Sequence, residues 1–266
     1  MSRIAELFIR LKTESLQRVD QKARCALIAY ITAGDPTPEA TPRYIDAMLR
    51  GGVDLIELGV PFSDPIADGP VIQQAGDRAI KAGTNLAKVL EIAREVRSRS
   101  EVPLLLFTYL NPVVKYGFEK LAHDAKAAGI DGVLLTDASV EEADIYVAPM
   151  RAAGLDTVFL AAPTSSERRL KLVAQYSSGF VYMVSRTGIT GEQQTISDLA
   201  RPLIARMRTH TNLPLAMGFG ISTPAQVAAL KDHVDAVVVG SAIVRLIERE
   251  PAQLETFIAS LRAAIG

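Results

Sequence analysis

Eight short apolar, β-branched segments recur along the chain, with amphipathic segments between them. The junctions GGVD, AGID and AGLD each lead into such a segment; glycine suits the left-handed residue just past a helix end. The intervening segments, such as EKLAHDAKAAG and ERRLKLVAQYSS, have apolar residues at helical spacing. Strands that alternate with helices pair in parallel through crossovers. The expected strands are CALIAYIT (25–32), VDLIELGV (53–60), PLLLFTY (103–109), DGVLLTD (131–137), DTVFLAA (156–162), GFVYMVS (179–185), LPLAMGF (213–219) and DAVVVGS (235–241).

Eight strand–helix units in about 250 residues match the size of a (β/α)8 TIM barrel of the α/β class. An open, doubly wound parallel sheet is the alternative. The segment LFIRLKTESLQ before the first strand predicts an extra N-terminal helix that closes the bottom of the barrel. No Gly/Ser linker divides the chain, so we expect one domain over residues 1–266. The second unit is the longest, and its surplus follows the strand at the face where barrel enzymes hold their active sites.

The bulk properties exclude several classes of protein. A formal net charge of −1 gives no overall field to attract nucleic acid or an anionic membrane. No apolar run approaches the roughly 20 residues of a membrane span, and no secretory segment follows the early charges. The one cysteine, Cys25, cannot form an internal disulfide and fits a reducing compartment. We therefore expect a cytoplasmic protein.

An acidic residue interrupts the second strand, and two more follow it. Side chains alternate along a strand, so Val53, Leu55 and Glu57 share one face. If the other face packs on helices, Glu57 points into the barrel, where apolar surroundings raise the pKa of its carboxyl. Such a group can both give and accept a proton. The structural alternatives are a Glu57 paired with arginine or a hydroxyl, and Asp64 and Asp68 that cap turns in the proline-rich loop PFSDPIADGP.

Two other aspartates stand beside expected strands. We interpret Asp35, in TAGDPTPEA, as a turn and N-cap residue. Asp137 closes its strand and could either line the site or cap the next helix.

Other catalytic groups are poorly placed. A Schiff base needs a lysine at the site, but no lysine lies in an expected strand. The histidines His123, His210 and His233 are scattered over expected helices and their ends, and Cys25 begins a strand. We therefore expect no metal site, and acid–base chemistry by carboxylates.

Glycines gather at the ends of the last strands. Gly218 and Gly220 end one strand, Gly240 ends the next, and Gly188 and Gly191 follow the strand before them. Glycine lets backbone N–H groups approach a ligand closely, and Ser241 can open a helix whose N-terminus attracts an anion. Barrel enzymes often bind phosphate after strands seven and eight, so a phosphorylated ligand is expected.

The motifs LIELGVPFSDPIADGPVIQ, ITAGDPT, VSRTGITG, GFGIS and GSAIV, in this order, resemble those of the tryptophan synthase α subunit family. The resemblance implies a (β/α)8 barrel and a lyase of tryptophan biosynthesis. This enzyme would cleave indole-3-glycerol phosphate to indole and glyceraldehyde 3-phosphate. It also implies a β-subunit partner in an α2β2 heterotetramer, with pyridoxal phosphate in the β subunit and no cofactor in this chain.

The resemblance also implies roles for single residues. Glu57 matches the acid–base glutamate, and Asp68 matches the aspartate that binds the indole N–H. In one departure, Ala138 and Ser139 replace the family's usual apolar–proline pair, which affects loop closure and partner contact rather than the chemistry. The remaining matches are the site-lining aromatics Tyr30, Tyr182 and Phe219, the loop residue Thr190, and the phosphate-binding residues Gly191, Gly220, Gly240 and Ser241.

Three alternative functions stay open at this point. An isomerase or epimerase of phosphosugars would share the phosphate site but leave the loop after the second strand unexplained. A catalytically silent subunit that activates a β-type partner would need neither Glu57 nor Asp68. A stand-alone lyase that releases indole would share all of these residues.

Overall fold

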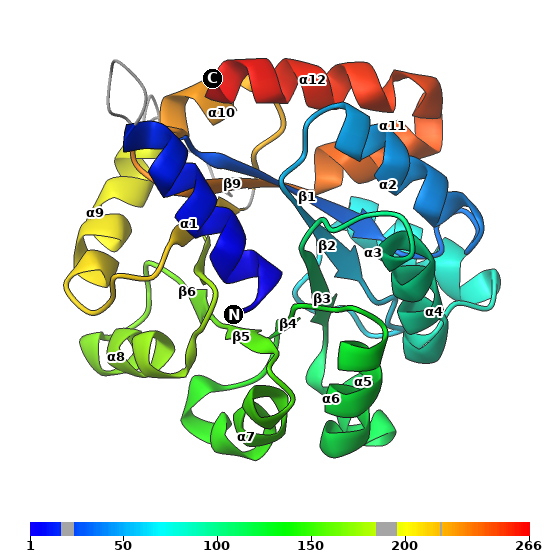
Figure 1. Cartoon of the computed structure of the whole chain (residues 1–266), viewed down its shortest axis with the longest axis horizontal. Helices are drawn as coiled ribbons and strands as arrows, with labels where there is room; N and C mark the ends of the chain where they lie inside the picture. Colours follow the sequence, from blue (N-terminus) through cyan, green and yellow to red (C-terminus); the bar gives the residue numbers. More distant parts are fainter. Residues whose placement is uncertain (17–23, 185–195, 219) are drawn as a thin grey trace.

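Parallel strands form one sheet whose two ends meet (Figure 1). The computed structural model describes residues 1–16, 24–184, 196–218 and 220–266. The order of strands in the sheet is β5-β4-β3-β2-β1-β9-β8-β7-β6. Only Phe159 separates β5 from β6, so these two pieces of one segment close the sheet into a barrel. The strands are β1 (Ala26–Thr32), β2 (Leu55–Gly59), β3 (Leu104–Thr108), β4 (Gly132–Leu135), β5 (Asp156–Val158), β6 (Leu160–Ala161), β7 (Val181–Val184), β8 (Leu215–Gly218) and β9 (Ala236–Val239).

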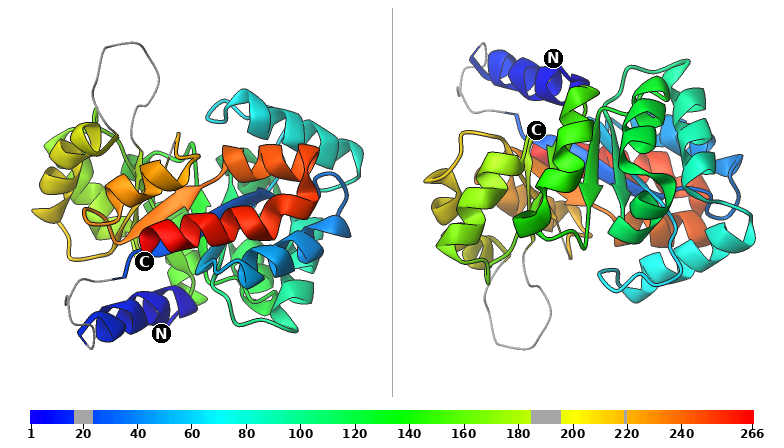
Figure 2. Two further views of the ribbon diagram at one scale, coloured as in Figure 1. Left: turned by 90° about the horizontal axis from the view of Figure 1, so that it is seen from above. Right: turned by 90° about the horizontal axis from the view of Figure 1, so that it is seen from below.

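Helices surround the barrel, and the views from above and from below show them outside the strands (Figure 2). The connection from β2 to β3 carries two helices and is the longest, as the sequence predicts. Within the described ranges, no helix has the length and apolarity that a bilayer crossing requires. The helices are α1 (Arg3–Leu16), α2 (Ala40–Arg50), α3 (Pro70–Lys81), α4 (Leu86–Arg97), α5 (Leu110–Tyr116), α6 (Phe118–Ala127), η1 (Val140–Glu142), α7 (Asp144–Ala152), α8 (Glu167–Tyr176), α9 (Ile196–Arg208), α10 (Pro224–Leu230), α11 (Ser241–Arg249), η2 (Pro251–Gln253) and α12 (Leu254–Ile265).

The N-terminal helix closes one end of the barrel (Figure 1). Its residues Ile4, Leu7 and Leu11 join the cluster of side chains that fills the barrel interior. Phe8 adds a ring contact to Phe180, with 6.1 Å between the centroids. The expected bottom-closing helix is confirmed.

Alternation along the strands separates the interior from the layer of helices. Leu55 and Glu57 of β2 face inward, whereas Ile56 and Leu58 pack with the helices. Val53, expected to share the face of Leu55, packs with the helices instead because it precedes the strand. All eight expected strands are present, so the TIM barrel is confirmed and the open sheet is wrong.

The aspartates of the repeated junctions tie neighbouring strands together at the end that α1 covers. Asp54 accepts the N–H of Leu27 at 2.9 Å, and Asp131 accepts that of Leu104 at 2.9 Å. Asp235 repeats this contact with Leu215 at 2.7 Å. Each carboxylate also meets arginine: for example, Arg262 lies 2.7 Å from Asp54. This end of the barrel is therefore held by paired charges.

Candidate active site

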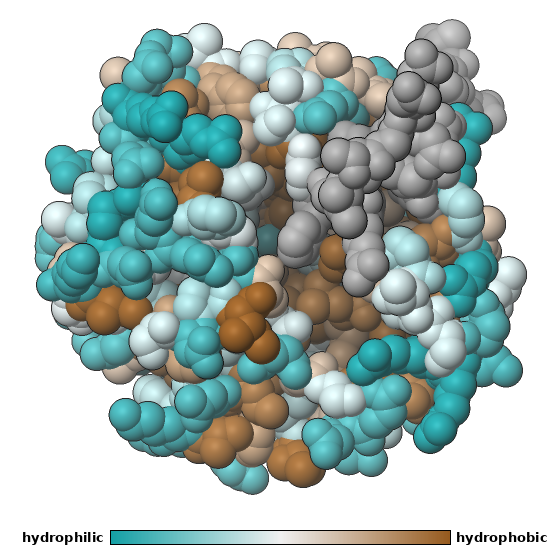
Figure 3. Space-filling model, turned by 180° about the vertical axis from the view of Figure 1, so that it is seen from behind, coloured by the Kyte–Doolittle hydropathy of each residue, from teal (hydrophilic) through white to brown (hydrophobic). Residues whose placement is uncertain are grey.

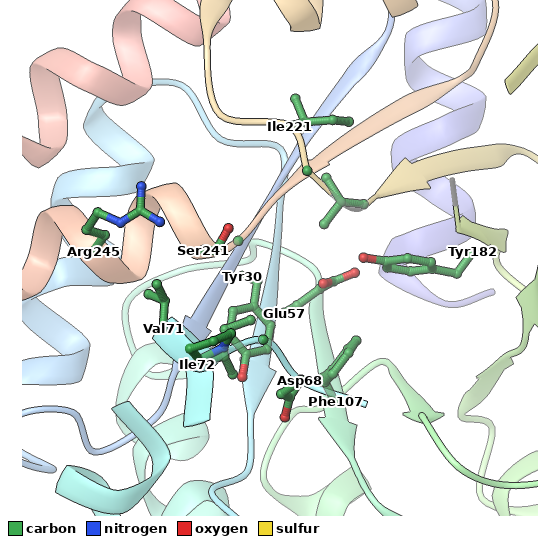
Figure 4. Close-up of a pocket in the computed structure, with 15 residues that line it drawn as sticks. Tyr30, Glu57, Asp68, Val71, Ile72, Phe107, Tyr182, Ile221, Ser241 and Arg245 are labelled. Carbon is green, nitrogen blue, oxygen red and sulfur yellow. The ribbon is translucent and has the colours of Figure 1, made fainter. Parts of the chain in front are cut away.

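A cavity of about 250 Å³ opens at the carboxyl ends of the strands, opposite α1. The space-filling view from behind Figure 1 shows this face hollowed near its centre, with apolar side chains beside the hollow (Figure 3). The residues that line the cavity come from β1, β2, β3, β7 and β9, from the segments that follow β2 and β8, and from α3 and the start of α11 (Figure 4). The lining residues are Tyr30, Glu57, Asp68, Gly69, Pro70, Val71, Ile72, Phe107, Tyr182, Gly220, Ile221, Val238, Gly240, Ser241 and Arg245.

Glu57 is the innermost acid of the cavity. It lies mid-strand in β2, in register with Tyr30 of β1 and Leu105 of β3. Its side chain is fully buried, and neither carboxyl oxygen has a hydrogen-bond partner among the described residues. Burial without a compensating cation raises the pKa of this carboxyl to about 8. At neutral pH Glu57 therefore holds a proton that it can donate. Among the described residues, neither an arginine nor a hydroxyl pairs with Glu57, so the structural alternative finds no partner there.

Asp68 approaches the cavity from the loop between β2 and α3. The loop is stiffened by prolines, and α3 begins at Pro70 directly after it. Asp68 is half-buried, and the Tyr109 hydroxyl donates a hydrogen bond of 2.9 Å to its Oδ2. Burial raises the pKa of Asp68 to about 6, although the hydrogen bond from Tyr109 opposes this shift. At neutral pH Asp68 is therefore mostly ionised, in contrast to Glu57.

Aromatic rings form the walls around the two acids. Tyr30 and Phe107 meet edge to face with 5.2 Å between centroids, and Phe107 lies 6.4 Å from Tyr182. The hydroxyl of Tyr182 points toward Glu57 (Figure 4). A side chain at Gly218 would collide with that hydroxyl, and one at Gly59 would collide with the hydroxyl of Tyr30. The glycines at these strand ends therefore make room for the tyrosines. Burial raises the pKa of both tyrosines well above the ordinary value, so they stay protonated.

The opposite side of the cavity suits an anion. Helix α11 begins at Ser241, directly after Gly240, and both residues line the cavity, so the N-terminus of this helix, with its unpaired N–H groups, lies at the cavity wall. Gly220 has φ +74°, a left-handed conformation that favours glycine. Arg245, one turn along α11, is the one cationic side chain among the described lining residues. A helix N-terminus and an arginine together attract a phosphate group.

The cavity gathers most of the residues that the sequence singled out. Glu57, Asp68, Tyr30 and Tyr182 line it, together with Gly220, Gly240 and Ser241. The other three, Thr190, Gly191 and Phe219, lie outside the described residues.

Sequence reasoning missed several residues of the site. Phe107 shares the inward face of β3, and strand alternation could have identified it. Arg245 follows Ser241 by one helical turn, a spacing that also signals a shared site. Tyr109 gives no such signal, because its partner Asp68 is 41 positions earlier in the chain.

The remaining candidate acids lie elsewhere. Asp64 is exposed and does not line the cavity. Both expectations for Asp137 are wrong: it neither lines the cavity nor caps the helix that follows it, and it accepts the N–H of Leu110 at 2.7 Å at the start of the preceding α5. Asp35 lies in a turn as expected, but its role as N-cap is wrong: α2 begins at Ala40, and Arg78 holds the carboxylate at 2.7 and 2.9 Å. The described residues contain no cluster of three or more potential metal ligands.

Comparisons with known proteins agree with this architecture. The family model described as tryptophan synthase alpha chain matches residues 16–266. The tryptophan synthase alpha chain of Solibacter usitatus is 63% identical over 100% of this chain and 99% of its own length. That of Geobacter sulfurreducens is 47% identical, with both chains fully covered. The crystal structure of the Legionella pneumophila alpha subunit superposes with a TM-score of 0.89 at 34% identity, covering 100% and 98% of the two chains. A structure of Mycobacterium tuberculosis tryptophan synthase superposes with a TM-score of 0.89 at 32% identity. The match covers 99% of this chain and 98% of that one.

Proposed function

The chain belongs to the tryptophan synthase alpha chain family, and from this premise we propose how its cavity performs the family's reaction. The protein is a lyase of tryptophan biosynthesis that cleaves indole-3-glycerol phosphate to indole and glyceraldehyde 3-phosphate. The observation that carries the residue assignment is Glu57, a fully buried carboxyl without a hydrogen-bond partner in the described chain, at the base of the cavity.

Cleavage begins with protonation of the indole ring. Glu57 donates its proton to C3 of the ring, which turns indole into a leaving group. The positive charge that develops spreads to the ring nitrogen, and the Asp68 carboxylate stabilises it through the N–H. The pKa values of about 8 for Glu57 and about 6 for Asp68 support this division of roles.

Bond cleavage then returns the proton to the enzyme. The glycerol hydroxyl next to the ring gives its proton to the Glu57 carboxylate as its carbon becomes an aldehyde. The electron pair of the broken C–C bond restores the aromatic indole, which keeps the proton at C3. Glu57 is protonated again at the end, so one carboxyl serves both steps.

The phosphate of the substrate occupies the side of the cavity formed by Gly220, Gly240 and Ser241. N–H groups at the start of α11 would bind its oxygens, and Arg245 would add a positive charge. Tyr30, Phe107 and Tyr182 would hold the ring against the two acids. We assign Thr190, Gly191 and Phe219 to the same site on the family resemblance alone.

The family implies a β-subunit partner for this chain. We propose an α2β2 complex in which pyridoxal phosphate belongs to the β subunit and this chain uses no cofactor. We further propose that residues 1–266 form one domain and that the protein works in the cytoplasm, which suits its single cysteine, Cys25.

The matches over the whole chain do not favour a phosphosugar isomerase, a silent subunit or a stand-alone lyase. The presence of both Glu57 and Asp68 in one cavity also argues against a silent subunit.

The direct test is indole release by the purified chain from indole-3-glycerol phosphate, compared with Glu57→Gln. Glutamine keeps the shape but has no proton to exchange, so we expect kcat to fall at least ~10²–10⁴-fold. Glu101→Gln is the control, because Glu101 is 79% exposed and pairs with Arg3 of the helix that closes the opposite end. Circular dichroism checks that both variants are folded. A Glu57→Gln chain with turnover near that of wild type would remove Glu57 from the mechanism.

A further inference from the structure

Tyr109 is a buried side chain at the edge of the cavity that the family resemblance does not assign. It follows β3 directly and occupies the N-cap position of α5, but its side chain caps no N–H of that helix. Its residue is only 2% exposed. It does not line the cavity, but it contacts Asp68, which does.

Three contacts join Tyr109 to the loop between β2 and α3. Its hydroxyl donates to Asp68 Oδ2 at 2.9 Å and accepts the N–H of Ala67 at 3.1 Å. Its ring packs on Phe62, with 5.1 Å between centroids. The side chain of Gln73 adds two contacts to backbone carbonyls of the loop, of Asp68 at 2.9 Å and of Pro65 at 3.4 Å. Among these contacts, only the Tyr109 hydroxyl bonds the carboxylate itself.

The hydroxyl of Tyr109 also interacts with the side chain of Thr136, and its hydrogen bonds with Asp68 and Ala67 depend on each other. A phenol has one proton to donate, and the N–H of Ala67 approaches its oxygen as a donor. The hydroxyl proton is therefore directed to Asp68, and a donor of this kind favours the ionised carboxylate. Tyr109 occupies Oδ2, whereas no contact within the described chain occupies Oδ1 of Asp68. Oδ1 is then the oxygen left for a ring N–H.

We propose that Tyr109 is a positioning residue for the cleavage reaction, which fixes the Asp68 carboxylate toward the indole nitrogen through its hydroxyl. This inference rests on the role proposed above for Asp68. Tyr109 touches neither ring nor phosphate; it decides which oxygen of Asp68 faces the substrate and keeps that acid charged.

Among the described residues, no other side chain makes the contact to the Asp68 carboxylate that Tyr109 makes. Tyr30 and Tyr182 interact with the Asp68 charge from β1 and β7, but no described hydrogen bond joins either of them to it. Glu57, on β2, is an acid and would only disfavour a second negative charge. None of the ion pairs in the described residues includes Asp68. The Tyr109 hydroxyl is thus the group that opposes the effect of burial, which raises the pKa of Asp68 to about 6.

The test is Tyr109→Phe, which keeps the ring against Phe62 and removes both hydrogen bonds. A hydrogen bond to a charged group contributes about 1.5–3 kcal/mol, so kcat/KM should fall roughly 10–100-fold. Without the hydroxyl the pKa of Asp68 rises, so the acid limb of the kcat/KM profile should move to higher pH. The substrate phosphate itself titrates near pH ~6, so the readout is the shift between the two chains.

The matched control is Tyr116→Phe. Tyr116 also donates to an aspartate, Asp124, at 2.7 Å, but lies on α5 away from the cavity. Its removal should leave kcat/KM and the acid limb as in wild type. If Tyr109→Phe leaves the acid limb of the kcat/KM profile at the pH of wild type, the inference is overturned. This holds whether or not the rate or the unfolding midpoint changes.

A double-variant cycle separates this inference from the proposed function. If Tyr109 acts through Asp68, then Tyr109→Phe should cost little further rate in an Asp68→Asn background. Equal losses in both backgrounds would show a general effect on the loop and overturn the inference alone. An Asp68→Asn chain that cleaves substrate as wild type does would instead overturn the proposed role of Asp68.

Discussion

Buried acids lie at both ends of this barrel, but their surroundings differ. At the end that α1 closes, Asp131 is 2% exposed and meets Arg97 at 3.0 Å and Arg3 at 3.1 Å. At the opposite end, where the cavity opens (the open end), Glu57 is fully buried and meets no cation among the described residues. The first arrangement stabilises a charge. The second arrangement disfavours the ionised carboxylate, and burial therefore raises the pKa of Glu57 to about 8.

Pairing, rather than position along the barrel, decides which acid is free for chemistry. Asp35 follows β1 at the open end, yet Arg78 of α3 holds both of its oxygens. It does not line the cavity. An unpaired buried acid costs stability, so a chain retains one where the proton itself is used.

The largest expected effect is on stability at the open end. The unfolded chain releases the Glu57 proton near pH 4.5, whereas the folded chain holds it to about pH 8. Folding stability of wild type therefore falls as pH rises through this window. Glu57→Gln should match wild type near pH 4.5 and exceed it by roughly 4 kcal/mol at pH 8, at 1.36 kcal/mol per pKa unit. Urea unfolding of both chains across this range measures the difference, and parallel stability curves would contradict it.

The smaller effect is at the closed end and has the opposite sign. Asp131→Asn leaves Arg97, whose side chain is 12% exposed, without its buried carboxylate and with only the exposed Glu101 at 3.9 Å. Breaking such a buried pair should cost about 3 kcal/mol, with kcat for indole release unchanged.

The control for that variant is Asp46→Asn, because Asp46 and its partner Arg99 are 36% and 38% exposed. Exposed pairs contribute less than ~1 kcal/mol. If the Asp131 and Asp46 variants lose equal free energy of unfolding, the buried ion pairs do not stabilise the closed end more than exposed pairs do.

The sequence predicted the features that depend on local pattern. Strand alternation placed Glu57 inside the barrel, and the repeated junctions located the starts of the strands. The glycine before Ser241 predicted a helix start there, and α11 begins at Ser241 beside the cavity; phosphate binding at this place stays a prediction.

It could not predict contacts between distant positions. Arg3 and Asp131 are 128 positions apart, and Asp35 and Arg78 are 43 apart. Nothing in the local sequence of Asp35 distinguishes an N-cap from an ion pair with Arg78 on the distant helix α3. For the same reason the link from Tyr109 to Asp68 emerged only from the structure.

The most direct test of the difference between the paired acids at the closed end and the unpaired Glu57 is the pKa of Glu57 in the free protein. Carbon-13 labelling of the glutamate side chains would allow its carboxyl to be titrated by NMR, with Glu57→Gln to assign the signal. A value of about 8 is expected, because burial acts without a compensating partner. A value near the ordinary 4.5 would show that Glu57 is solvated or paired, and would contradict the account of an acid kept protonated for catalysis.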